Sequence, residues 1–186
     1  MSKKKIGKTT TSFNLENTSF IGIKNSSESY HFVYNFNKVC DTKMAKEIDF
    51  EFYDDSENMS YRYPIYLYID EAYDLTYFLV QTCVNNKLMH QAVQFYDKIL
   101  LITGRDHATV AADISSKCFE IPDTFCSDYI TFEESLDQKT KGKSKKALQN
   151  FLEKGLFLDM DSYFSRRNQE SGSESTNDSG DVFFQY

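Results

Sequence analysis

The sequence is poor in the residues that bend or break secondary structure, and it has no tryptophan. Only two prolines and seven glycines occur among 186 residues, which excludes collagen-like and Gly/Pro-rich low-complexity chains. No stretch reaches the roughly 18 consecutive apolar residues that a membrane-spanning helix needs. The first residues, MSKKKIGKTTTSF, contain lysines without the apolar segment of a secretory signal. We therefore expect a cytoplasmic protein with no membrane span.

Motifs of known chemistry are also lacking. The residues that could bind a metal lie far apart and show none of the tight paired spacings of structural zinc sites; they are His90, His107, Cys118 and Cys126. No G-x-S-x-G elbow marks a nucleophilic serine, and GRDHAT, which offers Arg105 to an anion, lacks a glycine-rich phosphate loop. We therefore predict no catalytic residue, no metal and no cofactor. Cys40, Cys83, Cys118 and Cys126 are expected to be free thiols, as in cytoplasmic proteins.

Aromatic residues, in contrast, are abundant. The 13 tyrosines and 16 phenylalanines make up 16% of the chain, and each such side chain buries a large apolar area. A chain of 186 residues is long enough for one domain with a substantial core. The net charge is −7, but four lysines lie within residues 1–13 and five within residues 139–146. The rest of the chain is acidic and repels nucleic-acid backbones unless the basic residues are segregated from it.

Apolar patterning predicts one α+β domain over residues 14–163. Alternating or continuous apolar runs indicate strands at residues 19–25, 48–55, 63–70, 75–84 and 97–104. A turn of only a few residues separates the strands at 63–70 and 75–84, so we expect a hairpin there. These strands favour a mainly antiparallel sheet with two or three packed helices.

Three segments have helical spacing of apolar residues. The first helix is expected to follow the N-cap candidates in Ser26–Ser29, and the second follows Asp106. A third helix is predicted over residues 144–153 and is expected to end at Gly155. The segment KLMHQAVQFY fits either a loop or a short helix.

The segment IPDTFCSDY, residues 121–129, combines a proline with two aspartates five residues apart. Asp123 and Asp128 could act as paired carboxylates in acid–base catalysis. The simpler interpretation is a proline-marked turn in which Asp123 accepts a backbone hydrogen bond. We predict this turn between two short strand pieces, CFEI and DYITF, and no catalysis by the two aspartates.

The order of these segments resembles that of the IPExxxVDY family, short proteins of Bacteroidota without an assigned activity. IGIKNSSESYHFVYNFNKVC is similar to the early block of that family, a strand, a polar turn and a helix with Tyr30 and Asn37. IPDTFCSDY matches the family signature at Ile121, Pro122, Asp128 and Tyr129. In the family the signature leads into a buried strand ended by glycine, and here that place is VQFYDKILLITG, where Asp97 agrees. The resemblance, over about residues 13–157, implies a small cytoplasmic α/β domain without catalytic residues.

The chain ends and the lysine-rich segment are the candidate partner-binding regions. Residues 1–13 are expected to form a basic flexible arm, and residues 164–186 a disordered tail that ends in the aromatic sequence DVFFQY. The candidate contact residues are Lys139, Lys141, Lys143, Lys145, Lys146, Phe183, Phe184 and Tyr186. We predict a non-catalytic, cytoplasmic protein-interaction or adaptor protein. The alternative is an RNA- or ribosome-associated factor whose lysines bind phosphates.

Overall fold

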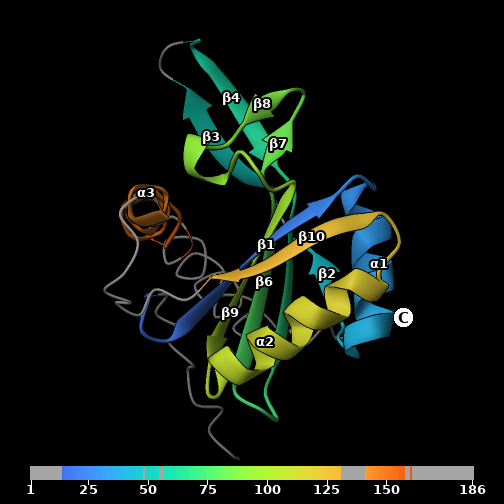
Figure 1. The fold of residues 1–186 in the computed structure, drawn as a ribbon. Coiled ribbons are helices and arrows are strands. Elements are labelled where there is room, and N and C mark those ends of the chain that lie inside the picture. Colours follow the sequence, from blue (N-terminus) through green and yellow to red (C-terminus); the bar gives the residue numbers. More distant parts are fainter. Residues whose placement is uncertain (1–13, 48, 55–56, 131–140, 158–159, 161–186) are drawn as a thin grey trace, which may run out of the picture.

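A six-stranded antiparallel sheet forms the centre of the protein (Figure 1). The computed structural model describes residues 14–47, 49–54, 57–130, 141–157 and 160. The strands lie in the order β10-β1-β9-β6-β5-β2 and are β1 (Thr18–Asn25), β2 (Ala45–Lys46), β5 (Ile65–Asp70), β6 (Leu75–Gln81), β9 (Lys98–Gly104) and β10 (Thr124–Ile130). The hairpin predicted from the two adjacent apolar runs is the pair β5 and β6. The predicted α+β class with a mainly antiparallel sheet is confirmed.

Two small hairpins project beyond one end of this sheet, at the top of Figure 1. They pair β3 (Phe50–Asp54) with β4 (Met59–Tyr63), and β7 (Cys83–Val84) with β8 (Lys87–Leu88). The predicted strand at 75–84 is therefore divided at Thr82. Thr82 is fully buried, and its N–H donates to the carbonyl of Asp97 at 3.0 Å. This hydrogen bond lies at the boundary between β6, which belongs to the main sheet, and β7, which belongs to the β7–β8 hairpin.

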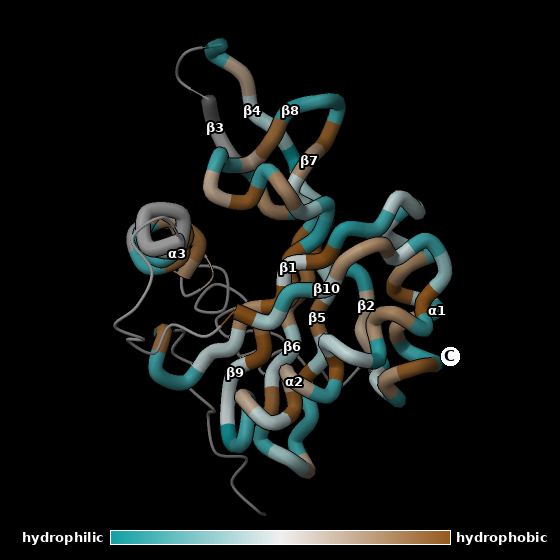
Figure 2. Tube along the Cα trace, in the orientation of Figure 1, coloured by the Kyte–Doolittle hydropathy of each residue, from teal (hydrophilic) through white to brown (hydrophobic). Residues whose placement is uncertain are grey.

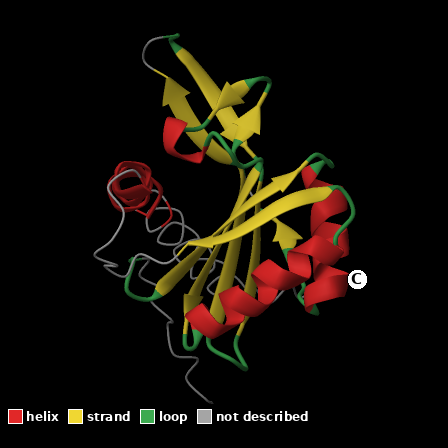
Figure 3. Ribbon diagram, viewed as in Figure 1, coloured by secondary structure: helices red, strands yellow, loops and turns green. Residues whose placement is uncertain are grey.

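Helices cover both faces of the sheet (Figure 3). One face, here called the α1–α2 face, is covered by α1 (Ser29–Cys40) and α2 (His107–Lys117). The opposite α3 face is covered by α3 (Lys141–Phe151) and the π-helical turn η3 (Leu152–Leu156). Two short 3-10 turns complete the fold: η1 (Gln91–Val93) precedes β9, and η2 (Cys118–Glu120) lies between α2 and β10.

The central position of β9, covered on both faces of the sheet, explains why its sequence is continuously apolar. Ile99 and Leu101 belong to the core of the α3 face, whereas Leu100 and Ile102 belong to the core of the α1–α2 face. Successive side chains of a strand point to opposite faces, so a strand covered on both sides needs apolar residues at every position. In Figure 2, brown hydrophobic segments run through the strands at the centre of the molecule.

The third helix differs from its prediction at both ends. It begins at Lys141 rather than Ser144, and Gly155 lies inside η3 instead of ending the helix. The cause is tertiary packing, because Leu152, Leu156 and Phe157 continue the buried apolar stripe of Leu148 on the α3 face. Burial of that stripe outweighs the helix-ending tendency of one glycine.

The region around Pro122 also differs from its prediction. CFEI is not a strand: Cys118–Glu120 forms η2, and the N–H of Ile121 donates to the carbonyl of Cys118 at 3.1 Å. TFCS is not an interruption, because it is the first half of β10. KLMHQAVQFY contains both β8 and η1. In the described part of the chain, no helix is long and apolar enough to cross a membrane, and the predicted arm (1–13) and tail (164–186) lie outside that part.

Candidate functional site

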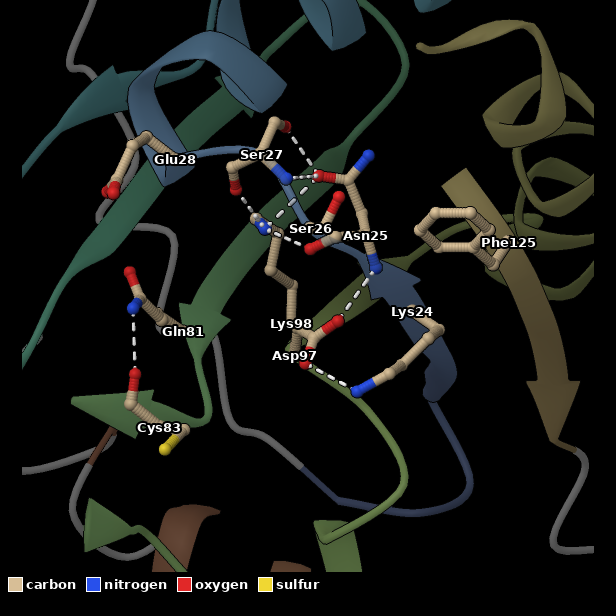
Figure 4. Close-up of a pocket in the computed structure, with 10 residues that line it drawn as sticks. All are labelled: Lys24, Asn25, Ser26, Ser27, Glu28, Gln81, Cys83, Asp97, Lys98 and Phe125. Carbon is tan, nitrogen blue, oxygen red and sulfur yellow. Dashed lines mark hydrogen bonds and ion pairs between the residues drawn. The ribbon is translucent and has the colours of Figure 1, made fainter. Parts of the chain in front are cut away.

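A buried lysine stands at the start of the central strand. Lys98 is only 2% exposed, and its Nζ donates to the carbonyl of Asn25 at 3.0 Å, the side-chain Oδ1 of Asn25 at 3.3 Å and the carbonyl of Ser27 at 2.9 Å. An ammonium group has three donors, so all three are used. Lys98 thus holds the turn between β1 and α1 (Figure 4).

Burial changes the acid–base behaviour of this amine. It lowers the pKa of Lys98 to about 8, because the charged form loses hydration, while the nearby carboxylates of Asp97 and Glu28 act in the opposite direction. The Nζ also lies 5.3 Å from the ring centroid of Phe32, within cation–π range. With this pKa, Lys98 is mostly protonated at neutral pH.

Asn25 joins this lysine to two turns. Its Oδ1 accepts hydrogen bonds from the N–H of Ser27 at 3.1 Å and the hydroxyl of Ser27 at 2.5 Å. Its Nδ2 donates to the carbonyl of Pro122 and to Oγ1 of Thr124, both at 2.9 Å. The buried Asn25 therefore connects the β1–α1 turn with the turn that enters β10.

The carboxylate of Asp97 completes this hydrogen-bonded cluster. Its Oδ1 forms an ion pair with Lys24 at 2.8 Å, and its Oδ2 accepts the N–H of Asn25 at 3.0 Å. Gln81, at the end of β6, accepts a hydrogen bond from the hydroxyl of Ser29 at 2.6 Å and donates one to the carbonyl of Cys83 at 2.7 Å. Asp97 and Gln81 are thus each held by hydrogen bonds to neighbouring protein groups.

The cluster forms the wall of a hollow of about 290 Å³. Its lining residues are Lys24, Asn25, Ser26, Ser27, Glu28, Gln81, Cys83, Asp97, Lys98 and Phe125. Phe125 is 69% exposed, and it lies in β10 where the pairing with β1 shifts register between Lys24 and Asn25. Such a bulge places an extra residue in one strand and can redirect its side chain. An exposed aromatic ring is thereby placed beside a preformed hollow.

This arrangement is better suited to binding than to covalent chemistry. A catalytic lysine must present a free amine to its substrate, whereas the three donors of Lys98 are directed at protein carbonyls. Asp97 is likewise bonded to Lys24 and Asn25. The hollow therefore offers a rigid shape and an aromatic edge to a ligand.

Among the residues that the structure describes, none of those that line the hollow was predicted to bind a partner. Lys141, Lys143 and Lys145 belong to the first turns of α3, and Lys146 on the same helix is exposed. Lys139 and the aromatic residues Phe183, Phe184 and Tyr186 lie outside the described residues. Lys98 and Phe125 were not predicted as site residues. The burial of one and the exposure of the other depend on contacts between distant segments, for which the sequence carries no local signal.

The two aspartates of IPDTFCSDY have different structural roles. Asp123 occupies the turn with a φ of 63°, and its carbonyl accepts the N–H of Ser26 at 3.3 Å. The predicted proline-marked turn is present, but Asp123 accepts this hydrogen bond with its backbone carbonyl and not with its carboxylate. Asp128 lies on β10 and accepts the hydroxyl of Tyr96 at 3.1 Å. Neither carboxylate lines the hollow.

The histidines and cysteines considered as metal ligands have other contacts. His90 accepts the N–H of Ala92 at Nδ1 and stacks on Phe151. His107 contacts the hydroxyl of Ser19 at 2.9 Å, and Cys118 is fully buried in the core of the α1–α2 face. Among the residues that the structure describes, no group of three or more metal-binding side chains comes together.

Comparisons of this chain with protein-family models, with curated proteins and with solved structures gave no match.

Proposed function

We propose that this chain is a non-catalytic protein-interaction or adaptor protein, and that a partner contacts the hollow beside Phe125. The observation that carries this proposal is the 69% exposure of a phenylalanine at the mouth of a preformed hollow. Aromatic side chains near pockets are frequent energetic centres of protein interfaces. Leaving such a ring in water is unfavourable, and contact with a partner would relieve that cost.

The hydrogen bonds around the hollow support this proposal. The turns that form its wall are joined through Asn25 and Lys98, so a partner would meet a surface whose shape is already established. Preorganisation reduces the entropic cost of association. The proposal places the protein in the cytoplasm, and the aromatic end of the tail, with Phe183, Phe184 and Tyr186, would be an additional contact.

A second function, binding to RNA or the ribosome, is favoured by the start of α3. Lys141, Lys143, Lys145 and Lys146 all lie within the first six residues of this helix. Positive charges near a helix N-terminus are unfavourable because that end already carries a partial positive charge. A bound phosphate backbone would offset this repulsion, and Lys139 would extend the same contact.

Affinity purification from the native host can separate the two functions. The tagged protein, its Phe125→Ala variant and a Phe119→Ala control would be purified with and without nuclease. Phe119 is 58% exposed and does not line the hollow. The interaction function predicts a defined protein partner that resists nuclease, is lost with Phe125→Ala and is kept with Phe119→Ala, at unchanged melting temperatures. Equal capture by all three proteins would refute the role of the hollow.

The RNA function makes the opposite prediction in the same experiment. Partners would disappear after nuclease treatment, and binding would decrease steeply with salt concentration. Replacing the five lysines at 139, 141, 143, 145 and 146 with glutamine would abolish that binding, while Phe125→Ala would leave it unchanged. Binding that survives the lysine replacements would exclude this function.

A further inference from the structure

The outer face of α1 exposes aromatic and basic side chains at regular spacing. Tyr30 and Tyr34 are each 59% exposed, although the opposite side of the same helix buries Phe32 and Phe36 completely. Lys38 follows one turn later and is also exposed. Residues four positions apart lie on one side of a helix, so these three side chains form a stripe, here called the α1 stripe. Figure 1 shows α1 at the outer edge of the described part of the molecule.

Contacts within the stripe already pair a cation with an aromatic ring. The Nζ of Lys38 lies 4.1 Å from the ring centroid of Tyr34. At the other end, the ring of Tyr30 lies 4.2 Å from that of His31. The amino-terminal end of the stripe is therefore aromatic, its centre is an aromatic ring, and its carboxy-terminal end is cationic.

We propose that the α1 stripe binds the same stripe of a second copy of this chain, with the two helices antiparallel and Tyr34 at the two-fold axis. Residue 34 lies midway between residues 30 and 38, so this register places Tyr30 opposite Lys38 of the second copy. The same contact occurs twice because a two-fold interface is isologous. Each Lys38 ammonium then lies between its own Tyr34 ring and the Tyr30 ring of the other chain, which is a favourable cation–π arrangement.

The charges of α1 support a second copy as the occupant. The stripe is complementary to itself only in the antiparallel direction, because a parallel pair would place Lys38 against Lys38. Antiparallel helices also bring the partly positive end of one against the partly negative end of the other. At the centre, the two Tyr34 rings can stack with an offset. This inference is independent of the function proposed for the hollow, which lies outside the stripe.

Charge changes at both ends of the stripe test the register. Sedimentation velocity over a range of concentrations would measure the dimerisation constant of the wild type, Tyr30→Lys, Tyr30→Glu, and the double variant Tyr30→Lys with Lys38→Glu. Tyr30→Lys should weaken dimerisation by roughly tenfold or more, because it places a second lysine cation opposite Lys38 of the other copy at both symmetric contacts. Tyr30→Glu should retain the dimer through a Glu–Lys pair, and the double variant should restore it. A wild type that remains monomeric, or equal effects of Tyr30→Lys and Tyr30→Glu, would overturn the proposal.

A cysteine at the two-fold axis gives a second, independent test of the register. Under mild oxidation, Tyr34→Cys should form a disulfide-linked dimer, because the two copies of residue 34 face each other. Tyr73→Cys is the matched control, since Tyr73 is 71% exposed and lies outside α1, and the wild type shows the background from the native thiols. Unchanged melting temperatures would show that both variants fold. Equal cross-linking of the two variants, or none in Tyr34→Cys, would overturn the proposal.

Discussion

The ring of Tyr96 lies directly on the backbone of Gly22. A Cβ atom added to Gly22 would meet the ring at 2.5 Å, and the Tyr96 hydroxyl donates to Asp128, the residue paired with Gly22 on β10. The ring also makes an edge contact with Phe20, at 6.1 Å between centroids. Gly22 is therefore required in the middle of β1 because Tyr96 occupies the space of its side chain. This ring connects β1 and β10 at the edge of the sheet.

The first prediction follows from that contact. Gly22→Ala should lower the free energy of unfolding by about 1–3 kcal/mol, because overpacking displaces the Tyr96 ring from the sheet. The same change in a Tyr96→Ala background should be neutral or slightly stabilising, since glycine itself is unfavourable in a strand. Chemical denaturation of the four proteins of this cycle measures the effect. A similar loss in both backgrounds would show that Tyr96 is not the reason for glycine.

The buried amine of Lys98 gives a prediction about pH. Its pKa of about 8 lies below the ordinary 10.5, so between these pH values the unfolded chain binds more protons than the folded chain. The contribution of Lys98 to stability must therefore increase as the pH rises from about 8 to 10.5. The full change is about 3 kcal/mol. Tyrosines and cysteines titrate in the same range, so the measurement compares the wild type with Lys98→Met.

The quantity to follow is the difference in unfolding free energy between these two proteins across that range. As the pH rises, the wild type should become more stable relative to Lys98→Met. Titration of groups common to both proteins largely cancels in this difference. A difference that stays constant would mean that the amine is solvated and keeps its ordinary pKa.

Asn25 should be one of the most sensitive polar positions in the protein. Asn25→Ala removes the acceptor shared by Ser27 and Lys98 and the donors to Pro122 and Thr124. The expected loss is about 2–4 kcal/mol, because buried partners are left without hydrogen bonds. The matched control is Asn35→Ala on the outer part of α1, where one side-chain bond to the carbonyl of His31 is lost. That control should change stability by less than about 0.5 kcal/mol, and comparable losses in both variants would contradict the role given to Asn25.

The turn before β10 supplies a test of backbone conformation. Asp123 has a φ of 63°, in the left-handed region that alanine adopts only at a cost. Asp123→Ala should therefore destabilise the protein by about 1 kcal/mol, whereas Asp123→Gly should have little effect because glycine adopts this φ freely. Thermal unfolding of both variants measures the difference. If glycine were as costly as alanine, the carboxylate rather than the backbone would be what the turn needs.

Several elements were predictable because their signals are local. The apolar run of β9, the β5–β6 hairpin and the amphipathic helix α1 follow from the order of a few neighbouring residues. The site was much less predictable. In DKILLITG, Lys98 has the position of an ordinary charged residue at a strand start, and Phe125 resembles any aromatic residue of a strand.

The sequence by itself determined the α+β class, the location of most strands and helices, and the turn at Pro122, because periodicity and turn chemistry act over a few residues. Tertiary structure alone decided that β3 and β4 leave the main sheet, that Cys118–Glu120 is a 3-10 turn, and that Tyr96 fills the space above Gly22. It also decided the burial of Lys98, whose three acceptors lie more than 70 residues away in the chain. Contacts of that range arise only when the sheet brings β1 beside β9, and it is there that the hollow forms.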